Sequence, residues 1–461
     1  MKRHSIAVAA LVLSAASAAS AASAASAQSI TDQYKDATAR IAKAALSDSA
    51  AWNRIADLTE RFGHRISGSQ SLEQAIDWII VQMTNDGLDN VKGEPVMVPR
   101  WVRGAESAEM VAPRVQNLPM LGLGGSIATP AGGITAEVLV VTSYDDLTAK
   151  AAQAKGKIVL FNVPFTSYGE TVRYRSGGAV AAAKVGAVAS IIRSVTPYSQ
   201  RTPHTGGMAY DSTVTKIAHA AITPEDADMI ARLIARGETV RVKLTMSAQW
   251  LPDSPSRNVM GEIKGRELPN EVIAMGGHID SWDVGRGAMD DAGGVVVAWE
   301  ALRILKRLNL QPRRTIRAVG WTNEENGTRG GNGYRDAHRA DAANHILMIE
   351  SDGGVFKPQG FGFTGPDAAM AMVQEIGGLI ERSIPGAGAI TKGGGGADIG
   401  PIMALGVPGM GLNVDGTRYF WYHHTDADTV DKLDPKEVAQ CAAVMAIMAY
   451  VVADMPTRLP R

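Results

Sequence analysis

The stretch NEVIAMGGHIDSWDVGRGAMDDAGGVVVAWEALRILKRLNL, residues 270–310, contains the pattern that decides the fold. An apolar run typical of a buried β-strand ends at His278, and a glycine-rich loop with several aspartates follows it. The loop leads into residues 293–310, whose apolar side chains recur at helical spacing. A strand, an acidic loop and a helix in this order predict one unit of an α/β sheet.

The alternation of strands and helices continues to the end of the chain. RRTIRAVGWTNEENG (313–327) and NHILMIESDGG (344–354) both have the pattern of strands that end in acidic residues. DPKEVAQCAAVMAIMAYVVAD (434–454) predicts a closing helix, with Asp434 as its cap and Pro435 in its first turn. We therefore predict an α/β fold with a doubly wound mixed sheet, helices on both faces, and a ligand site beyond the carboxyl ends of the strands.

Changes in composition divide the chain into four segments. We predict a signal peptide at 1–27, an N-terminal part of the main domain at 28–116, an inserted α/β domain at 117–248, and a C-terminal part of the main domain at 249–461. The N-terminal part is mainly helical, whereas the insert is rich in glycine and short apolar runs. The insert contains few candidate catalytic residues, and its loop histidine, His204, is interpreted as structural or substrate-lining.

The first 27 residues combine a basic start, a short apolar run and an Ala/Ser tract that ends in Ala25-Ser26-Ala27. This pattern is typical of a cleaved secretory signal, so we expect an exported protein, either periplasmic or secreted. The apolar run, residues 6–13, is too short to span a bilayer. No later run of 18 or more apolar residues occurs, and we therefore expect no membrane insertion.

The overall composition is that of a globular protein with a large core. Of the 461 residues, 45% are hydrophobic and 20% are charged, and the length suggests two domains. The 46 basic and 47 acidic residues nearly cancel, which gives no support for nucleic-acid binding. The single cysteine, Cys441, lies in an apolar helical stretch and is interpreted as a core residue.

The candidate chemistry comes from histidines and carboxylates that gather at the predicted strand ends. They are His278, Asp280, Asp290, Asp291, Glu324, Glu325, Asp352, His423 and His424. Each alone has an ordinary interpretation as a helix cap, a turn residue or part of a solvated face. Together, carboxylates at one sheet edge would repel each other, and a divalent cation would remove that cost. Nitrogen and oxygen ligands without thiolate suit zinc, with cobalt or manganese as substitutes.

Four segments resemble, in order, the catalytic segments of the co-catalytic zinc exopeptidases, a family that includes leucyl-type aminopeptidases, glutamate carboxypeptidase and carboxypeptidase Q. They are GGHIDSWDVGRGAMDDAGG (276–294), WTNEENG (321–327), ESDGG (350–354) and YHHTDADTVDKLDP (422–435). GGGGADIGP (393–401) resembles a further active-site loop of that family. The insert resembles a protease-associated domain, and its GGAVAAAKVGAVASIIRS (177–194) is most similar to carboxypeptidase Q.

The resemblance implies two zinc ions per chain and a role for each matched residue. One zinc would be held by His278, Asp352 and a shared Asp290, and the other by Glu325, His424 and the same Asp290. Glu324 would be the general base that acts with a zinc-bound hydroxide, and Asp280 would orient His278. His424 is preferred to His423 because the family has its histidine before Thr or Ser.

The implied activity is hydrolysis of dipeptides or short peptides with a free N-terminus, and the resemblance also implies a homodimer. Three alternatives stay open: an aminopeptidase on longer peptides, a single-zinc enzyme like glutaminyl cyclase, and a binding protein that has lost the metal. The complete set of ligand positions favours hydrolysis. The number of bound zinc ions separates the peptidases, with two, from the cyclase, with one, and from the binding protein, with none.

Overall fold

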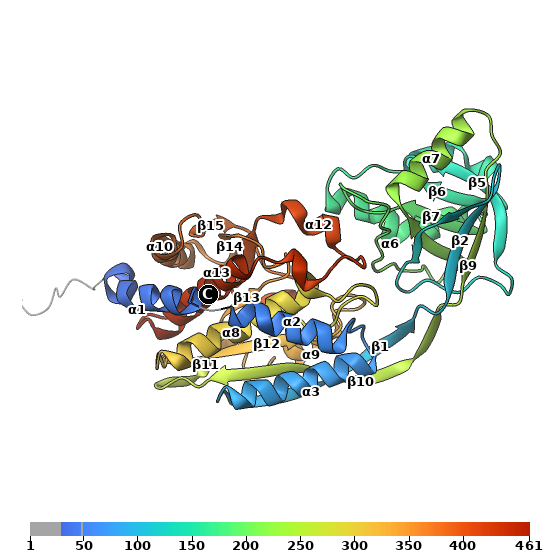
Figure 1. Cartoon of the computed structure of the whole chain (residues 1–461). Helices are drawn as coiled ribbons and strands as arrows, with labels where there is room; N and C mark the ends of the chain where they lie inside the picture. The colour runs from blue at the N-terminus through green and yellow to red at the C-terminus, as the bar shows by residue number, and fades with distance from the viewer. Residues whose placement is uncertain (1–28, 48) are drawn as a thin grey trace, which may run out of the picture.

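The described residues, 29–47 and 49–461 of a computed structural model, form two eight-stranded sheets joined by a long pair of strands (Figure 1). The predicted signal peptide, residues 1–27, lies outside the described residues. The first sheet has the strand order β1-β10-β12-β11-β13-β16-β14-β15. Its strands are β1 (Asp89–Val102), β10 (Gln249–Ile263), β11 (Leu268–His278), β12 (Arg314–Trp321), β13 (His345–Glu350), β14 (Pro358–Thr364), β15 (Ala389–Lys392) and β16 (Gly409–Val414).

The centre of the first sheet is parallel, antiparallel pairings flank it, and the edge strand β15 runs parallel to β14. β11 runs parallel to both β12 and β13, and β13 runs parallel to β16. β10 is antiparallel to β12, and β14 is antiparallel to β16. The prediction of a mixed α/β sheet is therefore confirmed, and the carboxyl ends of the three central strands meet at one edge.

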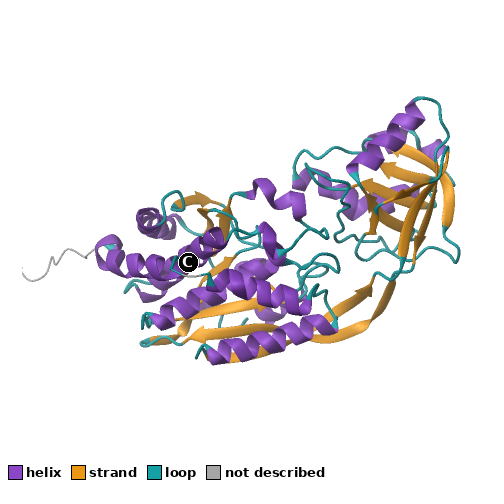
Figure 2. Cartoon of the chain, viewed as in Figure 1, coloured by secondary structure: helices purple, strands orange, loops and turns teal. Residues whose placement is uncertain are grey.

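Helices cover both faces of this sheet (Figure 2), because successive side chains of a buried strand point to opposite faces. Ile273 and Met275 of β11 pack in the larger core, and Val272 and Ala274 pack in a smaller core on the other face. The larger core includes α1 (Ile30–Ala45), α2 (Ala50–Phe62), α3 (Gln70–Asn85), α8 (Gly293–Arg307), α10 (Asp367–Ser383) and α13 (Pro435–Asp454). The smaller core includes α9 (Arg329–Ala337) and α11 (Gly400–Met403).

The closing helix α13 is long and apolar enough to cross a membrane, but it lies inside the protein. Of its most apolar 18-residue window, 89% is buried, and the helix packs against α8 and α1. Asp434 caps it by accepting a hydrogen bond from the Lys436 amide, and Pro435 occupies the first turn, as predicted. Cys441 is buried within this helix, also as predicted.

The second sheet has the order β3-β2-β9-β5-β6-β7-β8-β4. Its strands are β2 (Glu106–Ala112), β3 (Gln116–Leu118), β4 (Met120–Gly122), β5 (Ile134–Val141), β6 (Ile158–Phe161), β7 (Ala189–Arg193), β8 (Ala218–Ile222) and β9 (Arg241–Met246). Its helices are α4 (Tyr144–Ala149), α5 (Ala151–Ala154), α6 (Tyr168–Lys184) and α7 (Pro224–Ala235). This second domain begins before residue 117, the predicted boundary, because β2 pairs with β9 and not with the first sheet.

The remaining elements are short helical segments of the first domain. They are η1 (Ala288–Ala292), η2 (Ala342–Asn344), η3 (Gly416–Arg418), α12 (Tyr419–Tyr422) and η4 (Val430–Lys432). In Figure 1, α12 lies on the side of the first domain that faces α6 of the second domain. The segments η1 and α12 flank the region in which the predicted site residues meet.

Candidate metal centre

The parallel register of the central strands brings the predicted residues to one edge. His278 is the last residue of β11, and it lies beside Trp321, the last residue of β12. Glu324 follows β12 after a short turn, and Asp352 follows β13. Residues from three segments far apart in the sequence therefore share one buried region, as the strand-end pattern predicted.

His278, Asp290 and Asp352 form the first group. His278 Nε2 lies 3.2 Å from Asp290 Oδ1 and 3.4 Å from Asp352 Oδ1. One ligand atom from each residue lies within 4.8 Å of the others, so these three atoms could surround one ion. His278 and Asp290 are buried, and Asp352 is partly exposed.

Asp290, Glu325 and His424 form the second group. His424 Nε2 lies 3.0 Å from Glu325 Oε2 and 3.3 Å from Asp290 Oδ2. The two oxygens of Asp290 thus face different histidines, Oδ1 toward His278 and Oδ2 toward His424. One carboxylate lies between the two groups, as a bridging ligand would.

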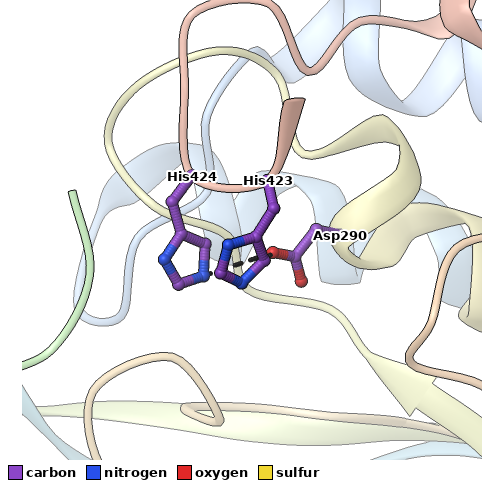
Figure 3. A group of neighbouring side chains, drawn as sticks. All are labelled: Asp290, His423 and His424. Atoms are coloured by element: carbon purple, nitrogen blue, oxygen red, sulfur yellow. Dashed lines mark ion pairs between the residues drawn. The ribbon is translucent and has the colours of Figure 1, made fainter. Parts of the chain in front are cut away.

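His423 lies beside His424, and Figure 3 shows both imidazoles next to the Asp290 carboxylate. The two rings stack with 3.4 Å between their centroids. His423 Nε2 is 3.6 Å from Asp290 Oδ2, farther than His424 Nε2. The contact with Glu325 distinguishes His424 further and supports the choice of His424 as a ligand.

Asp280 makes different contacts from those predicted. Its carboxylate lies 3.8 Å from His278 Nδ1, whereas its main-chain oxygen lies 2.9 Å from that nitrogen. The carboxylate instead accepts hydrogen bonds from the amides of Glu324 and Glu325, at 3.0 and 3.3 Å, and from the Ser67 hydroxyl. The main chain of Asp280 therefore orients the imidazole, and its side chain holds the turn that presents both glutamates.

Asp428, to which the sequence pattern assigns no role, holds the loop that carries Asp290. The Asp428 carboxylate accepts hydrogen bonds from the amides of Ala288, Met289 and Asp290, at 3.0, 2.9 and 3.3 Å. The only sequence signal for it is an acid four residues after His424. Its partners lie about 140 residues away in the chain, so a local pattern does not reveal the contact.

Two further residues support this loop, Asp291 at its end and Arg65 from the segment between α2 and α3. Asp291, just before α8, accepts hydrogen bonds from the amides of His278 and Gly294. Arg65 is fully buried and donates to the main-chain oxygens of Ile279, Arg286 and Gly287. The sequence around Arg65 contains no motif that predicts this role.

Burial and mutual repulsion shift the ionisation of the acidic groups. Burial, with help from neighbouring carboxylates, raises the pKa of Glu324 well above its usual range and that of Glu325 to about 7. Burial alone would lower the pKa of His424, but Glu325 and Asp290 outweigh it and raise the pKa to about 10. A proton on His424 therefore supplies positive charge at the position that a cation could occupy.

The donor set fits a divalent cation with a preference for nitrogen and oxygen ligands. Asp290 Oδ2 is buried and has no hydrogen-bond partner among the described residues. Imidazole nitrogens and carboxylate oxygens surround the region, and the single cysteine bonds elsewhere, to Phe356. Zinc accepts this combination of ligands.

Comparison with known proteins agrees with this arrangement. The model of the family described as "Peptidase family M28" matches residues 258–449. Carboxypeptidase Q of Xenopus laevis is 47% identical over 432 residues, which cover 93% of this chain and 92% of that protein. Carboxypeptidase Q of Homo sapiens is 45% identical over 425 residues, which cover 92% and 90%.

The chain belongs to peptidase family M28. A solved M28 peptidase precursor from Shewanella amazonensis SB2B has a TM-score of 0.89 at 36% identity, covering 93% of this chain and 99% of that one. A zinc aminopeptidase from Bacillus subtilis has the same fold at 21% identity, with a TM-score of 0.66 and coverage of 89% and 96%. The predicted family and fold are confirmed, and the enzyme is a metallopeptidase.

Proposed function

We propose that this M28 peptidase is a di-zinc exopeptidase that hydrolyses dipeptides or short peptides with a free N-terminus. The observation that carries the proposal is the position of Asp290, whose two carboxylate oxygens face His278 and His424 separately, at 3.2 and 3.3 Å. Two metal ions that share one carboxylate need this arrangement. The similarity to carboxypeptidase Q over nearly the whole chain supports the substrate class.

We assign the ligands by group. His278, Asp352 and Asp290 would hold one zinc ion, and Glu325, His424 and Asp290 would hold the other. When bound, zinc ions polarise a peptide carbonyl group and lower the pKa of water. The residues around them supply the positioning and the proton transfers.

Glu324 is suited to act as the general base and acid. It neighbours the ligand Glu325 in sequence, and the Asp280 carboxylate accepts hydrogen bonds from both main-chain amides, which fixes the turn. Burial raises the pKa of Glu324 toward the range in which a carboxyl group can both take and give a proton. Glu324 would take a proton from the attacking water and pass it to the leaving amine.

The location of the activity follows from the N-terminal segment. The basic start, the apolar run and the Ala25-Ser26-Ala27 pattern support export of the mature enzyme. We therefore propose that the substrates are peptides outside the cytoplasm. An exported exopeptidase of this kind would complete the breakdown of peptides that endopeptidases have already shortened.

The experiment is a substrate panel combined with metal analysis of the purified mature chain. Free dipeptides, tripeptides, longer peptides and N-terminally blocked dipeptides are assayed beside a zinc determination. We expect two zinc ions per chain, rapid cleavage of free dipeptides and no cleavage of blocked ones.

Other outcomes would reassign the enzyme. Equal cleavage of tripeptides and longer chains would make it a general aminopeptidase. One zinc ion without hydrolysis would indicate the chemistry of a glutaminyl cyclase, and no zinc would indicate a binding protein. Cleavage of blocked dipeptides would remove the requirement for a free N-terminus.

A further inference from the structure

A loop of the second domain docks on the turn that carries His423 and His424. The amide of Thr205 donates a hydrogen bond to the main-chain oxygen of His424 at 3.0 Å. His204 Nδ1 lies 2.7 Å from the main-chain oxygen of His423. His204 and Thr205 are 2% and 1% exposed, so this docking contact is closed to solvent.

The same loop contacts the imidazole of His424. The main-chain oxygen of Thr205 lies 3.3 Å from His424 Nδ1, while Nε2 faces Glu325 and Asp290. When Nε2 binds a metal, Nδ1 carries the ring proton and donates a hydrogen bond to a carbonyl oxygen in this position. Arg175, also in the second domain, lies 3.5 Å from the same Nδ1 and donates a hydrogen bond to the Tyr168 hydroxyl.

The second domain also reaches Glu325, through Trp282. The amide of Trp282 donates a hydrogen bond to Glu325 Oε1 at 3.2 Å, and the indole meets the His424 ring edge-on at 5.7 Å. The six-membered ring of the indole lies against Gly124 of the second domain. A Cβ atom at Gly124 would lie only 1.9 Å from Trp282 Cη2, so no larger residue fits there without moving the indole.

An ion pair between Arg103 and Asp283 stabilises the contact between the two domains. Arg103, which follows β1, pairs with Asp283 at 2.5 Å and donates a hydrogen bond to the Thr205 hydroxyl at 3.1 Å. The side chains of Arg103 and Asp283 are 10% and 12% exposed. Asp283 is the neighbour of Trp282, so one guanidinium ties the docking loop to the loop that positions Glu325.

The first group has no comparable contact in the described part of the chain. His278 is held by the main-chain oxygen of Asp280 and by the Asp291 carboxylate, and its imidazole faces Asp290 and Asp352. All of these residues belong to the first domain. The two groups share Asp290 but differ in what surrounds them.

We propose that the second domain is a positioning device for only one of the two metal ions, the one held by Glu325 and His424. Docking of the loop that contains His204 and Thr205 sets the orientation of His424, and the contact of Gly124 with Trp282 sets the position of Glu325. Weaker docking of the second domain then weakens zinc binding by Glu325 and His424, whereas zinc binding by His278 and Asp352 is unchanged. This inference rests on the proposed two-zinc function.

The test substitutes Gly124→Ala in the full-length mature enzyme and measures zinc binding to the metal-free protein by calorimetry. We expect one of the two binding events to weaken by about 10- to 100-fold, the usual effect of losing a contact behind a metal ligand. Gly169→Ala is the matched control, because this exposed glycine of α6 has no atom within 4 Å of an added Cβ. The control should bind two zinc ions as the parent does.

A second variant and a combination identify the affected group. Arg103→Met breaks the ion pair without adding volume at the docking contact, and it should weaken the same zinc-binding event. This variant provides the test if Gly124→Ala fails to fold. His278→Ala should retain one zinc ion, and the addition of Gly124→Ala should weaken that remaining ion.

The outcomes separate the two proposals. Equal weakening of both ions in Gly124→Ala and Arg103→Met, or no change in either, would overturn the positioning role while two bound ions in the parent still support the proposed function. A parent enzyme that binds fewer than two zinc ions would overturn the proposed function itself.

Discussion

The two sheets of this enzyme have the same number of strands and a parallel centre, yet only one holds a candidate catalytic site. In the first sheet, β11, β12 and β13 are followed by histidine and carboxylates that converge on Asp290. In the second sheet, β6, β7 and β8 are followed by Asn162, Ser194 and Thr223. The architecture of a parallel sheet offers a place for a site, and the residues just beyond the strand ends decide whether chemistry occurs there.

The strand ends of the second sheet serve for docking. The Ser194 hydroxyl, just beyond β7, accepts a hydrogen bond from the amide of His204 and donates one to the main-chain oxygen of Ile222. The neighbouring Thr205 contacts His424. The second sheet therefore acts on the site through its loops, and the following predictions test this division of roles.

The largest effect is expected for Glu324→Gln. Removal of the group that transfers protons should lower kcat/KM by about 100- to 10,000-fold while bound metal is retained. Glu238→Gln, at an exposed position of the second domain, is the matched control and should leave kcat/KM unchanged. Activity within threefold of the parent would remove Glu324 from the mechanism.

Removal of the metal should destabilise the first domain more than the second. Ions bound at a concentration a thousand times the dissociation constant contribute about 4 kcal/mol each to the free energy of unfolding, and the vacated carboxylates repel. All eight tryptophans lie outside residues 106–246, so tryptophan fluorescence during urea unfolding reports on the first domain and on its contact with the second, where Trp282 lies against Gly124. An unchanged midpoint after chelation would contradict the prediction.

Acid should destabilise the second domain through His219. Burial lowers the pKa of His219 to about 4, and its ring nitrogens face the main-chain oxygens of Ser190 and Arg175. Above the unfolded pKa of 6.5 its contribution to stability is fully present. As the pH falls from there toward 4, the unfolded chain takes up a proton that the folded one does not, and about 3 kcal/mol is lost.

Hydrogen exchange of the β7 and β8 amides at pH 7 and pH 4.5 measures this loss. In His219→Asn the difference in protection between the two pH values should become smaller. An equally large difference in the variant would assign the acid sensitivity to another group.

The smallest effect is expected for Asp428→Asn. One of the oxygens that accept hydrogen bonds from the Ala288, Met289 and Asp290 amides becomes an amide group, which leaves a buried donor without a partner and costs about 1–3 kcal/mol. Thermal unfolding measures the loss. Since the loop carries Asp290, metal affinity should fall with it, whereas an unchanged melting temperature would show that these hydrogen bonds are not needed.

The local sequence pattern predicts the strands and helices that carry the site, but it does not predict the long-range contacts between them. An apolar run that ends at His278, or a few residues before Glu324, predicts both the strand and the nearby chemistry, because burial and strand ends follow from the order of residues. The contacts of the Asp280 main-chain oxygen and of the Asp428 carboxylate depend on the folded geometry, and the residue types do not predict them.

The docking of the second domain could not be predicted for the same reason. Thr205 and His424 are 219 positions apart, and Thr205 makes both contacts with its main-chain atoms, which its residue type does not specify. Likewise, the second domain starts at β2 because Glu106–Ala112 pairs with β9. The pattern of this strand alone is compatible with either sheet, so it does not predict the boundary.

The chain enters and leaves the second domain at adjacent points, because Val102 of β1 is paired with Gln249 of β10. Paired residues in an antiparallel ribbon lie only about 5 Å apart, a gap that a short hairpin turn can close. The second domain is therefore a cassette that a single recombination event could add to or remove from an ancestral hydrolase without rethreading its sheet. The same geometry makes residues 103–248 a natural unit for exchange between family members in protein engineering.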